Sequence, residues 1–136
     1  MVGIVVVSHS ERAAAGIAEI AAEMAGDTRI EPVGGDGKGG IGTVPDAIED
    51  AIDAAAGGAG DGGDGSDGDG VVVLVDLGSA VMNADVAVEL SGAEAVIADA
   101  PVLEGAVNAA VAATDPSATI ESVREQAEAT RDIEKL

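Results

Sequence analysis

Two short runs of branched apolar residues constrain the fold of this chain more than any other feature. Residues 2–7 read VGIVVV and residues 71–76 read VVVLVD, and neither run alternates with polar side chains. A continuous run of this length is typical of a strand that is buried on both faces of a parallel sheet. Because parallel strands are joined by long crossovers, the segments between them are expected to be helical. The chain is therefore predicted to be α/β.

The remaining segments alternate as this class requires. We predict further strands at 29–33 and 95–98, and helices at 11–24, from Pro45 to about residue 56, at 79–90, at 101–114 and from Ser117 onwards. The side chains expected to face the core from the first, second and last of these helices are Ile17, Ile20 and Met24, then Val44, Ala47, Ile48, Ala51, Ile52 and Ala55, then Ile120, Val123 and Ala127. The order βαβαβαβαα predicts an open, mainly parallel sheet with helices on both faces.

The composition fits one folded domain. A chain of 136 residues suits a single domain that spans residues 1–136. It has no Phe, Tyr, Trp or Cys, so aliphatic residues and alanine must build a closely packed core, and thiol chemistry is excluded. Residues 57–70 read GGAGDGGDGSDGDG and are predicted to form a flexible Gly/Asp-rich loop, since they lack the spacing of calcium-binding repeats.

The charge excludes several classes of partner. The chain has 26 acidic and 6 basic residues, which gives a net charge of −20. It therefore has no basic patch for nucleic acid or for an anionic membrane, and its apolar runs are too short to span a bilayer. Met1 leads directly into a strand without a signal-like region, so we expect a cytoplasmic protein. The acidic surface is the kind expected in a halophilic organism, whose high salt screens self-repulsion.

One histidine, His9, stands directly after the first strand, at the start of a helix. Asp76, followed by Gly78 and Ser79, occupies the corresponding place after the third strand, and a glycine loop at 34–42 followed by Thr43 comes after the second. Ser8 and Glu11 have the spacing of a capping box at the first helix. Because the carboxyl ends of parallel strands share one edge of a sheet, we expect these polar groups to converge there.

Such a set of groups suits phosphoryl transfer through a phosphohistidine. A neutral imidazole nitrogen is a nucleophile, a carboxylate behind the ring fixes its tautomer, and helix starts and glycine turns offer N–H donors to phosphoryl oxygens. The sequence lacks a G-x-S-x-G elbow, a phosphate-binding P-loop and a cluster of metal ligands around His9, so we expect no metal and no cofactor held by this chain. Asp76, Ser79 and Thr43 fit equally well as helix caps.

Four motifs in order extend this interpretation by resemblance. They are GIVVVSHS at 3–10, GG followed by GIGT within 34–43, VDLGSA at 75–80 and APVLEGA at 100–106. Together they resemble the phosphotransferase subunits of PTS-dependent dihydroxyacetone kinases (DhaM), which have the mannose-type enzyme IIA fold. The resemblance spans essentially the whole chain.

The resemblance implies a relay in which HPr, phosphorylated from phosphoenolpyruvate through enzyme I, donates to His9. The group would then pass to ADP on the nucleotide-binding subunit of the kinase, and the ATP formed would phosphorylate dihydroxyacetone on a substrate-binding subunit. The resemblance also implies Nε2 as the phosphorylated atom, Asp76 as the group that orients the ring, and a homodimer. With no HPr-like domain on this chain, the donor is expected to be a separate protein.

Two other functions remain open at this stage. Mannose-type enzyme IIA proteins of sugar transporters resemble G-T-H-G at the histidine and G-G-S-P after the aspartate, where this chain has Ser-His-Ser and Leu-Gly-Ser-Ala. The difference favours the kinase subunit over the transporter. The chain could also be a non-catalytic regulator that reports the state of the phosphotransferase system by being phosphorylated on His9.

Overall fold

The computed structural model describes residues 1–57 and 69–136, so most of the loop predicted at 57–70 lies outside the described residues. The elements follow the predicted order, with short 3₁₀ turns added before α3 and after α5. They are β1 (Gly3–Ser8), α1 (Glu11–Ala22), β2 (Ile30–Gly34), α2 (Pro45–Ala55), β3 (Val71–Val75), η1 (Gly78–Ala80), α3 (Val81–Leu90), β4 (Ala95–Ile97), α4 (Val102–Ala113), α5 (Ile120–Glu128) and η2 (Ala129–Asp132).

Within the described residues the sheet has four strands in the order β2-β1-β3-β4, and every pair is parallel. The connection from β1 leads to β2 on one side of β1, and the connection from β2 then crosses to β3 on the opposite side of β1. Val7 at the end of β1 is level with Val33 of β2 and with Val75 of β3. The direction of winding reverses between β1 and β3, and open α/β sheets bind their ligands outside the carboxyl ends of strands at such a point.

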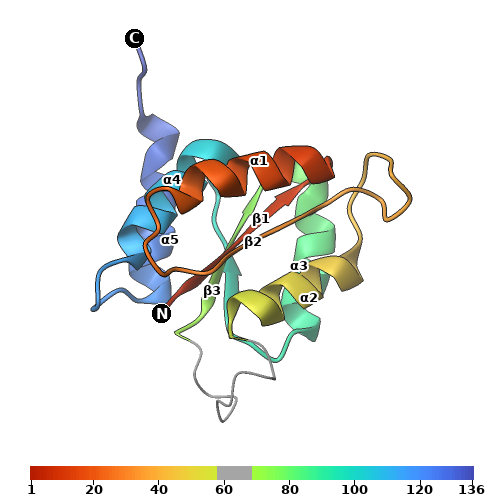
Figure 1. The fold of residues 1–136 in the computed structure, drawn as a ribbon, viewed down its shortest axis with the longest axis horizontal. Helices are drawn as coiled ribbons and strands as arrows, with labels where there is room; N and C mark the ends of the chain where they lie inside the picture. The colour runs from red at the N-terminus through yellow and green to blue at the C-terminus, as the bar shows by residue number, and fades with distance from the viewer. Residues whose placement is uncertain (58–68) are drawn as a thin grey trace.

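Helices cover both faces of the sheet (Figure 1). Ile4 and Val6 of β1 belong to the core under α1, α4 and α5, whereas Val5 and Val7 belong to the core under α2 and α3. All four side chains are fully buried, as expected for a central parallel strand. The predicted fold class, an α/β domain with an open parallel sheet between two helical layers, is confirmed.

The inner face of the first helix matches the prediction only in part. Its buried residues are Ala14, Ala18 and Ala21, and Ile17 packs against the core as predicted, whereas Ile20 and Met24 are about half exposed. At 100° per residue the three alanines form one narrow stripe, Ile20 lies about 120° away from it, and Met24 follows the end of the helix at Ala22. In a helix made mostly of alanine, the small side chains let the backbone approach the sheet closely, so the largest apolar residues do not mark the inner face.

The α4 helix also approaches the sheet closely, and a glycine permits it. A Cβ atom added to Gly105 would lie 2.9 Å from Leu74 Cδ1 and 3.0 Å from Ala100 Cβ, which is tighter than ordinary carbon contacts, so these neighbours would have to shift. Buried alanines complete this face of α4. The core therefore replaces missing aromatic bulk with short distances between helix and sheet.

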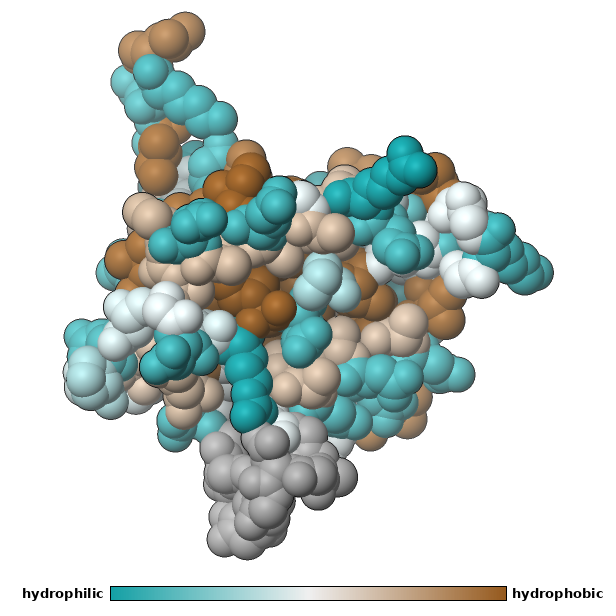
Figure 2. Space-filling view, viewed as in Figure 1, coloured by the Kyte–Doolittle hydropathy of each residue, from teal (hydrophilic) through white to brown (hydrophobic). Residues whose placement is uncertain are grey.

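The surface is largely hydrophilic, with apolar atoms visible between polar side chains on the face shown in Figure 2. Several large apolar residues of the protein are exposed, among them Ile41, Leu77 and Met82. No helix within residues 1–57 and 69–136 is long and apolar enough to cross a membrane.

Candidate active site

His9 lies in the short connection between β1, which ends at Ser8, and α1, which begins at Glu11. With only two residues between the elements, the imidazole must stay at the carboxyl edge of the sheet, beside the end of β3 in the centre of the fold. Its side chain is 21% exposed, so the ring is held by the protein yet remains open to another molecule.

Asp76 fixes the orientation of the His9 ring. Its Oδ1 atom lies 3.0 Å from His9 Nδ1, and its Oδ2 atom accepts from the backbone N–H of His9 at 3.0 Å and from Ser8 Oγ at 3.0 Å. The backbone N–H of Asp76 donates to the carbonyl of Val7, which ties the residue after β3 to the end of β1. The carboxylate is thus held against both the backbone and the ring of His9.

The charge of Asp76 determines which nitrogen of His9 carries the proton. Partial burial opposes ionisation, but hydrogen bonds from the His9 backbone, the His9 ring and Ser8, together with the His9 charge, outweigh it and hold the pKa of Asp76 below its ordinary value of 3.8. An ionised carboxylate only accepts hydrogen bonds, so Nδ1 must be the donor. In the neutral ring Nε2 then has the free lone pair of a nucleophile.

Ser79, in the η1 turn after β3, completes this line of contacts. Its Oγ atom lies 3.0 Å from His9 Nε2, on the side of the ring away from Asp76. With Nε2 unprotonated, the Ser79 hydroxyl donates to it. The residue before η1 is Leu77 and the residue before α3 is Ala80, and neither helix start is capped by a side chain. The geometry therefore does not support the alternative that Asp76 and Ser79 serve as helix caps.

The glycine loop lies beside the histidine, and several of its N–H groups form hydrogen bonds within the protein. Gly42 N donates to the carbonyl of His9 at 2.9 Å, while the N–H groups of Lys38 and Gly40 donate to Asp36 Oδ1 at 2.7 and 2.9 Å. Positive φ angles at the neighbouring glycines let the loop curl around the Asp36 carboxylate. These three N–H groups of the loop are therefore not available to a ligand.

Thr43 and Gly78 border the site from two sides. Thr43 Oγ1 accepts from Asn83 Nδ2 at 2.7 Å, and Asn83 Nδ2 also lies 3.3 Å from the Thr43 carbonyl. Val44, not Thr43, is the residue before α2, and that helix start has no side-chain cap. Gly78 lies at the start of η1, where an added Cβ would meet open space. Both residues therefore stand at the same edge as His9, and the structure ties Thr43 to Asn83 of α3.

Two polar residues of the site were not predicted as such. Ser8 was expected to cap α1, but the N-cap is Ser10, whose side chain accepts from Ala13 N at 3.1 Å, and Ser8 contacts Asp76 instead. A hydroxyl at the end of an otherwise apolar buried strand was the available signal. Asn83 had no comparable signal, because its partner Thr43 is 40 residues away in sequence.

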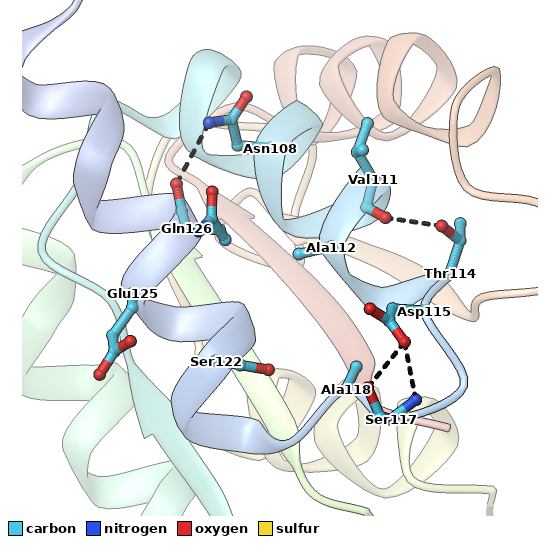
Figure 3. Close-up of a pocket in the computed structure, with 10 residues that line it drawn as sticks. All are labelled: Asn108, Val111, Ala112, Thr114, Asp115, Ser117, Ala118, Ser122, Glu125 and Gln126. Carbon is cyan, nitrogen blue, oxygen red and sulfur yellow. Dashed lines mark hydrogen bonds between the residues drawn. The ribbon is translucent and has the colours of Figure 1, made fainter.

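The structure also contains a cavity of about 620 Å³ between α4 and α5 (Figure 3). Some of its polar groups are bonded within the protein: Asn108 Nδ2 donates to the carbonyl of Gln126, and Asp115 accepts from the N–H and hydroxyl of Ser117. In the described ranges no group of three or more His, Asp or Glu side chains is placed to hold a metal ion. The reactive geometry is therefore at His9.

The fold and the site together define an open α/β domain with a single oriented histidine at the reversal point of its sheet. Residues 3–124 match the family model described as PTS system fructose IIA component (EIIA-man), and the chain belongs to this family. The mannose-type enzyme IIA resemblance stated from the motifs is thus confirmed.

Several characterised relatives of this chain carry related names. It is 35% identical over 126 residues to the PTS-dependent dihydroxyacetone kinase phosphotransferase subunit DhaM of Lactococcus lactis, covering 93% of each chain. It is 38% identical over 104 residues to a phosphoryl donor subunit DhaM of a PEP-dependent dihydroxyacetone kinase of Listeria innocua, covering 76% of this chain and 75% of the relative. The crystal structure of the unknown-function protein EF1359 superposes with a TM-score of 0.78 at 26% identity, covering 99% and 98% of the two chains.

Proposed function

We propose that this chain is the phosphoryl donor subunit of a phosphoenolpyruvate-dependent dihydroxyacetone kinase and that His9 carries the phosphoryl group. The names of its relatives support the class of reaction. The observation that carries the proposal is the continuous line Asp76–His9–Ser79, with both contacts of the ring at 3.0 Å. This line leaves Nε2 as an accessible nucleophile whose opposite nitrogen is fixed.

In the first step the lone pair of His9 Nε2 attacks the phosphorus of the phosphorylated donor. The new P–N bond forms as the bond from phosphorus to the donor breaks, and the donor retains that electron pair. No proton has to leave Nε2, because Nδ1 keeps the ring proton. The positive charge that develops on the ring is stabilised by Asp76, which lies behind it and away from the phosphoryl dianion.

Ser79 then changes partner. Its hydroxyl, which donates to Nε2 in the free protein, turns to a phosphoryl oxygen once Nε2 is bonded to phosphorus. Thr43 and the backbone N–H of Gly78 bind the other phosphoryl oxygens. Because Asn83 already donates to Thr43 Oγ1, the hydroxyl proton of Thr43 is free to point to the ligand. The second step reverses the first, with a terminal oxygen of ADP as the attacking group.

The partners follow from this relay. We propose that HPr donates the group and that ADP on the nucleotide-binding kinase subunit accepts it, while a further subunit binds dihydroxyacetone. The chain itself holds no nucleotide, acts as a homodimer and works in the cytoplasm. Its net charge of −20 favours a halophilic setting, where salt screens repulsion between acidic partners.

One reconstitution tests the choice of acceptor. The protein is phosphorylated with HPr, enzyme I and phosphoenolpyruvate, separated, and mixed with the ADP-loaded kinase subunit and dihydroxyacetone in molar salt. We expect dihydroxyacetone phosphate in amounts set by the phosphorylated protein. Phosphorylation on His9 without product would overturn the kinase assignment and favour a transporter enzyme IIA or a regulator, which a sugar-transport or regulatory acceptor would then distinguish.

A further inference from the structure

Ser8 is the last residue of β1 and is almost completely buried, with 2% of its surface exposed. The rest of this strand is apolar, so a hydroxyl here is unexpected for packing alone. Burying a hydroxyl without a partner is unfavourable, so its bonds must account for its presence. Ser8 has two: its Oγ atom donates to Asp76 Oδ2 at 3.0 Å and accepts from Ser10 N at 3.1 Å.

The direction of both hydrogen bonds is determined. Ser10 N–H can only donate, and an ionised Asp76 can only accept, so the single proton of the Ser8 hydroxyl must point to Asp76. The hydroxyl therefore has no freedom to rotate to another partner. It connects the start of α1, where Ser10 caps the helix, to the carboxylate after β3.

The consequence for His9 follows from how Asp76 is held. Oδ2 is occupied by two donors, the Ser8 hydroxyl and the His9 backbone N–H, which leaves Oδ1 to face the ring. Without Ser8, one of the two donors that lock Oδ2 is lost and the carboxylate gains rotational freedom. The bond from Nδ1–H to Oδ1 would weaken, and the ring would lose its bias toward the tautomer with a free Nε2.

We propose that Ser8 is a positioning residue that acts through Asp76 to hold His9 in its reactive tautomer. The inference rests on the proposed function for its effect on transfer, because a fixed tautomer matters to phosphorylation at Nε2. The tautomer itself is independent of that function. Ser8 touches no reacting atom and is distinct from Ser79, which contacts Nε2 directly.

The experiment uses the fact that the chain has one histidine, so imidazole ¹⁵N signals need no assignment. Wild type, Ser8→Ala, Ser8→Thr and Ser10→Ala are compared at a pH where the ring is neutral. We expect Nδ1 and Nε2 shifts of a single Nδ1–H tautomer in wild type and Ser8→Thr, and shifts averaged between tautomers in Ser8→Ala. Phosphorylation by HPr should slow roughly ten-fold in Ser8→Ala and recover in Ser8→Thr.

Ser10→Ala is the matched control, because it removes the cap of α1 and leaves the donors to Asp76 in place. We expect it to lower the urea concentration at the unfolding midpoint and to keep the wild-type tautomer. Wild-type shifts in Ser8→Ala, or equal tautomer mixing in Ser10→Ala, would overturn the proposal. If Ser8→Ala does not fold, Ser8→Cys, a near-isostere with a weak donor, decides it by the same shifts. Lack of phosphorylation in the wild type would defeat the proposed function alone.

Discussion

The cavity between α4 and α5 and the surroundings of His9 are both polar, but they differ in how their polar groups are arranged. The cavity between α4 and α5 has about 620 Å³ of space, and Asn108, Asp115 and Ser117 in its lining are hydrogen-bonded within the protein (Figure 3). In the His9 region the ring has an orienting carboxylate on one nitrogen and an exposed hydroxyl on the other.

Space alone is therefore a poor guide to chemistry in this fold. A cavity volume does not orient a reactive atom, whereas the bond from His9 Nδ1 to Asp76 leaves the lone pair of Nε2 facing the Ser79 hydroxyl. The position of His9 at the reversal point of the sheet adds to the contrast, since the strand order brings the ends of β1 and β3 together there.

The largest difference between the two regions should be seen when one group is removed from each. His9→Ala should abolish acid-labile, base-stable phosphate on the protein, because no other side chain of the chain forms a phosphohistidine. Asn108→Ala in the cavity should be labelled at the wild-type rate. Incubation with phosphorylated HPr and counting of bound phosphate measures both. A label that survives in His9→Ala would falsify the assignment of the site.

Removing the orienting carboxylate should have the next largest effect. We expect Asp76→Ala to slow phosphorylation about 100-fold, since the ring then loses both its fixed tautomer and the charge that stabilises it. Circular dichroism should show the same helix content as in the wild type. Wild-type rates in this variant would mean that the bond between Asp76 and His9 is structural only.

A smaller effect is expected from the hydroxyl on the other side of the ring. Ser79→Ala should slow transfer roughly ten-fold, because one hydrogen bond to a phosphoryl oxygen is lost while Nε2 stays a nucleophile. The phosphorylated form should also hydrolyse faster than in the wild type. Single-turnover labelling and decay of the isolated phosphoprotein separate the two effects, and an unchanged rate of both would leave Ser79 without a role in binding.

Acid should remove the stability that Asp76 contributes, because the pKa of its carboxyl is lowered in the folded protein. Its pKa is lower in the folded protein than the ordinary value of 3.8, so the stability it contributes is present above that value and is lost as the pH falls through the folded-state pKa. The difference in unfolding free energy between wild type and Asp76→Asn should therefore shrink below about pH 5. Urea unfolding at several pH values measures it. A difference that grows in acid would contradict this sign.

Much of the fold could be predicted from local patterns. The buried runs in β1 and β3 have no polar positions, and each helix is long enough to be distinguished from a strand. The buried face of a helix and the residue that caps it were harder to predict. Ile20 and Met24 were expected in the core, but alanine forms the inner face of α1, and Ser10 rather than Ser8 caps that helix. Neighbouring serines offer the same local signal, so the surrounding structure selects between them.

In the candidate site, too, some features could be predicted from local residues and others depend on the surrounding structure. The place of His9 directly after a buried strand, at the carboxyl edge of a parallel sheet, could be predicted from local residues, because a continuous apolar run is typical of a strand covered on both faces. The pairing of β1 with β3 could not, although it brings together residues 67 positions apart and places the carboxylate of Asp76 on His9 Nδ1. Strand order depends on how whole helices pack across both faces, and no local pattern of residues records it.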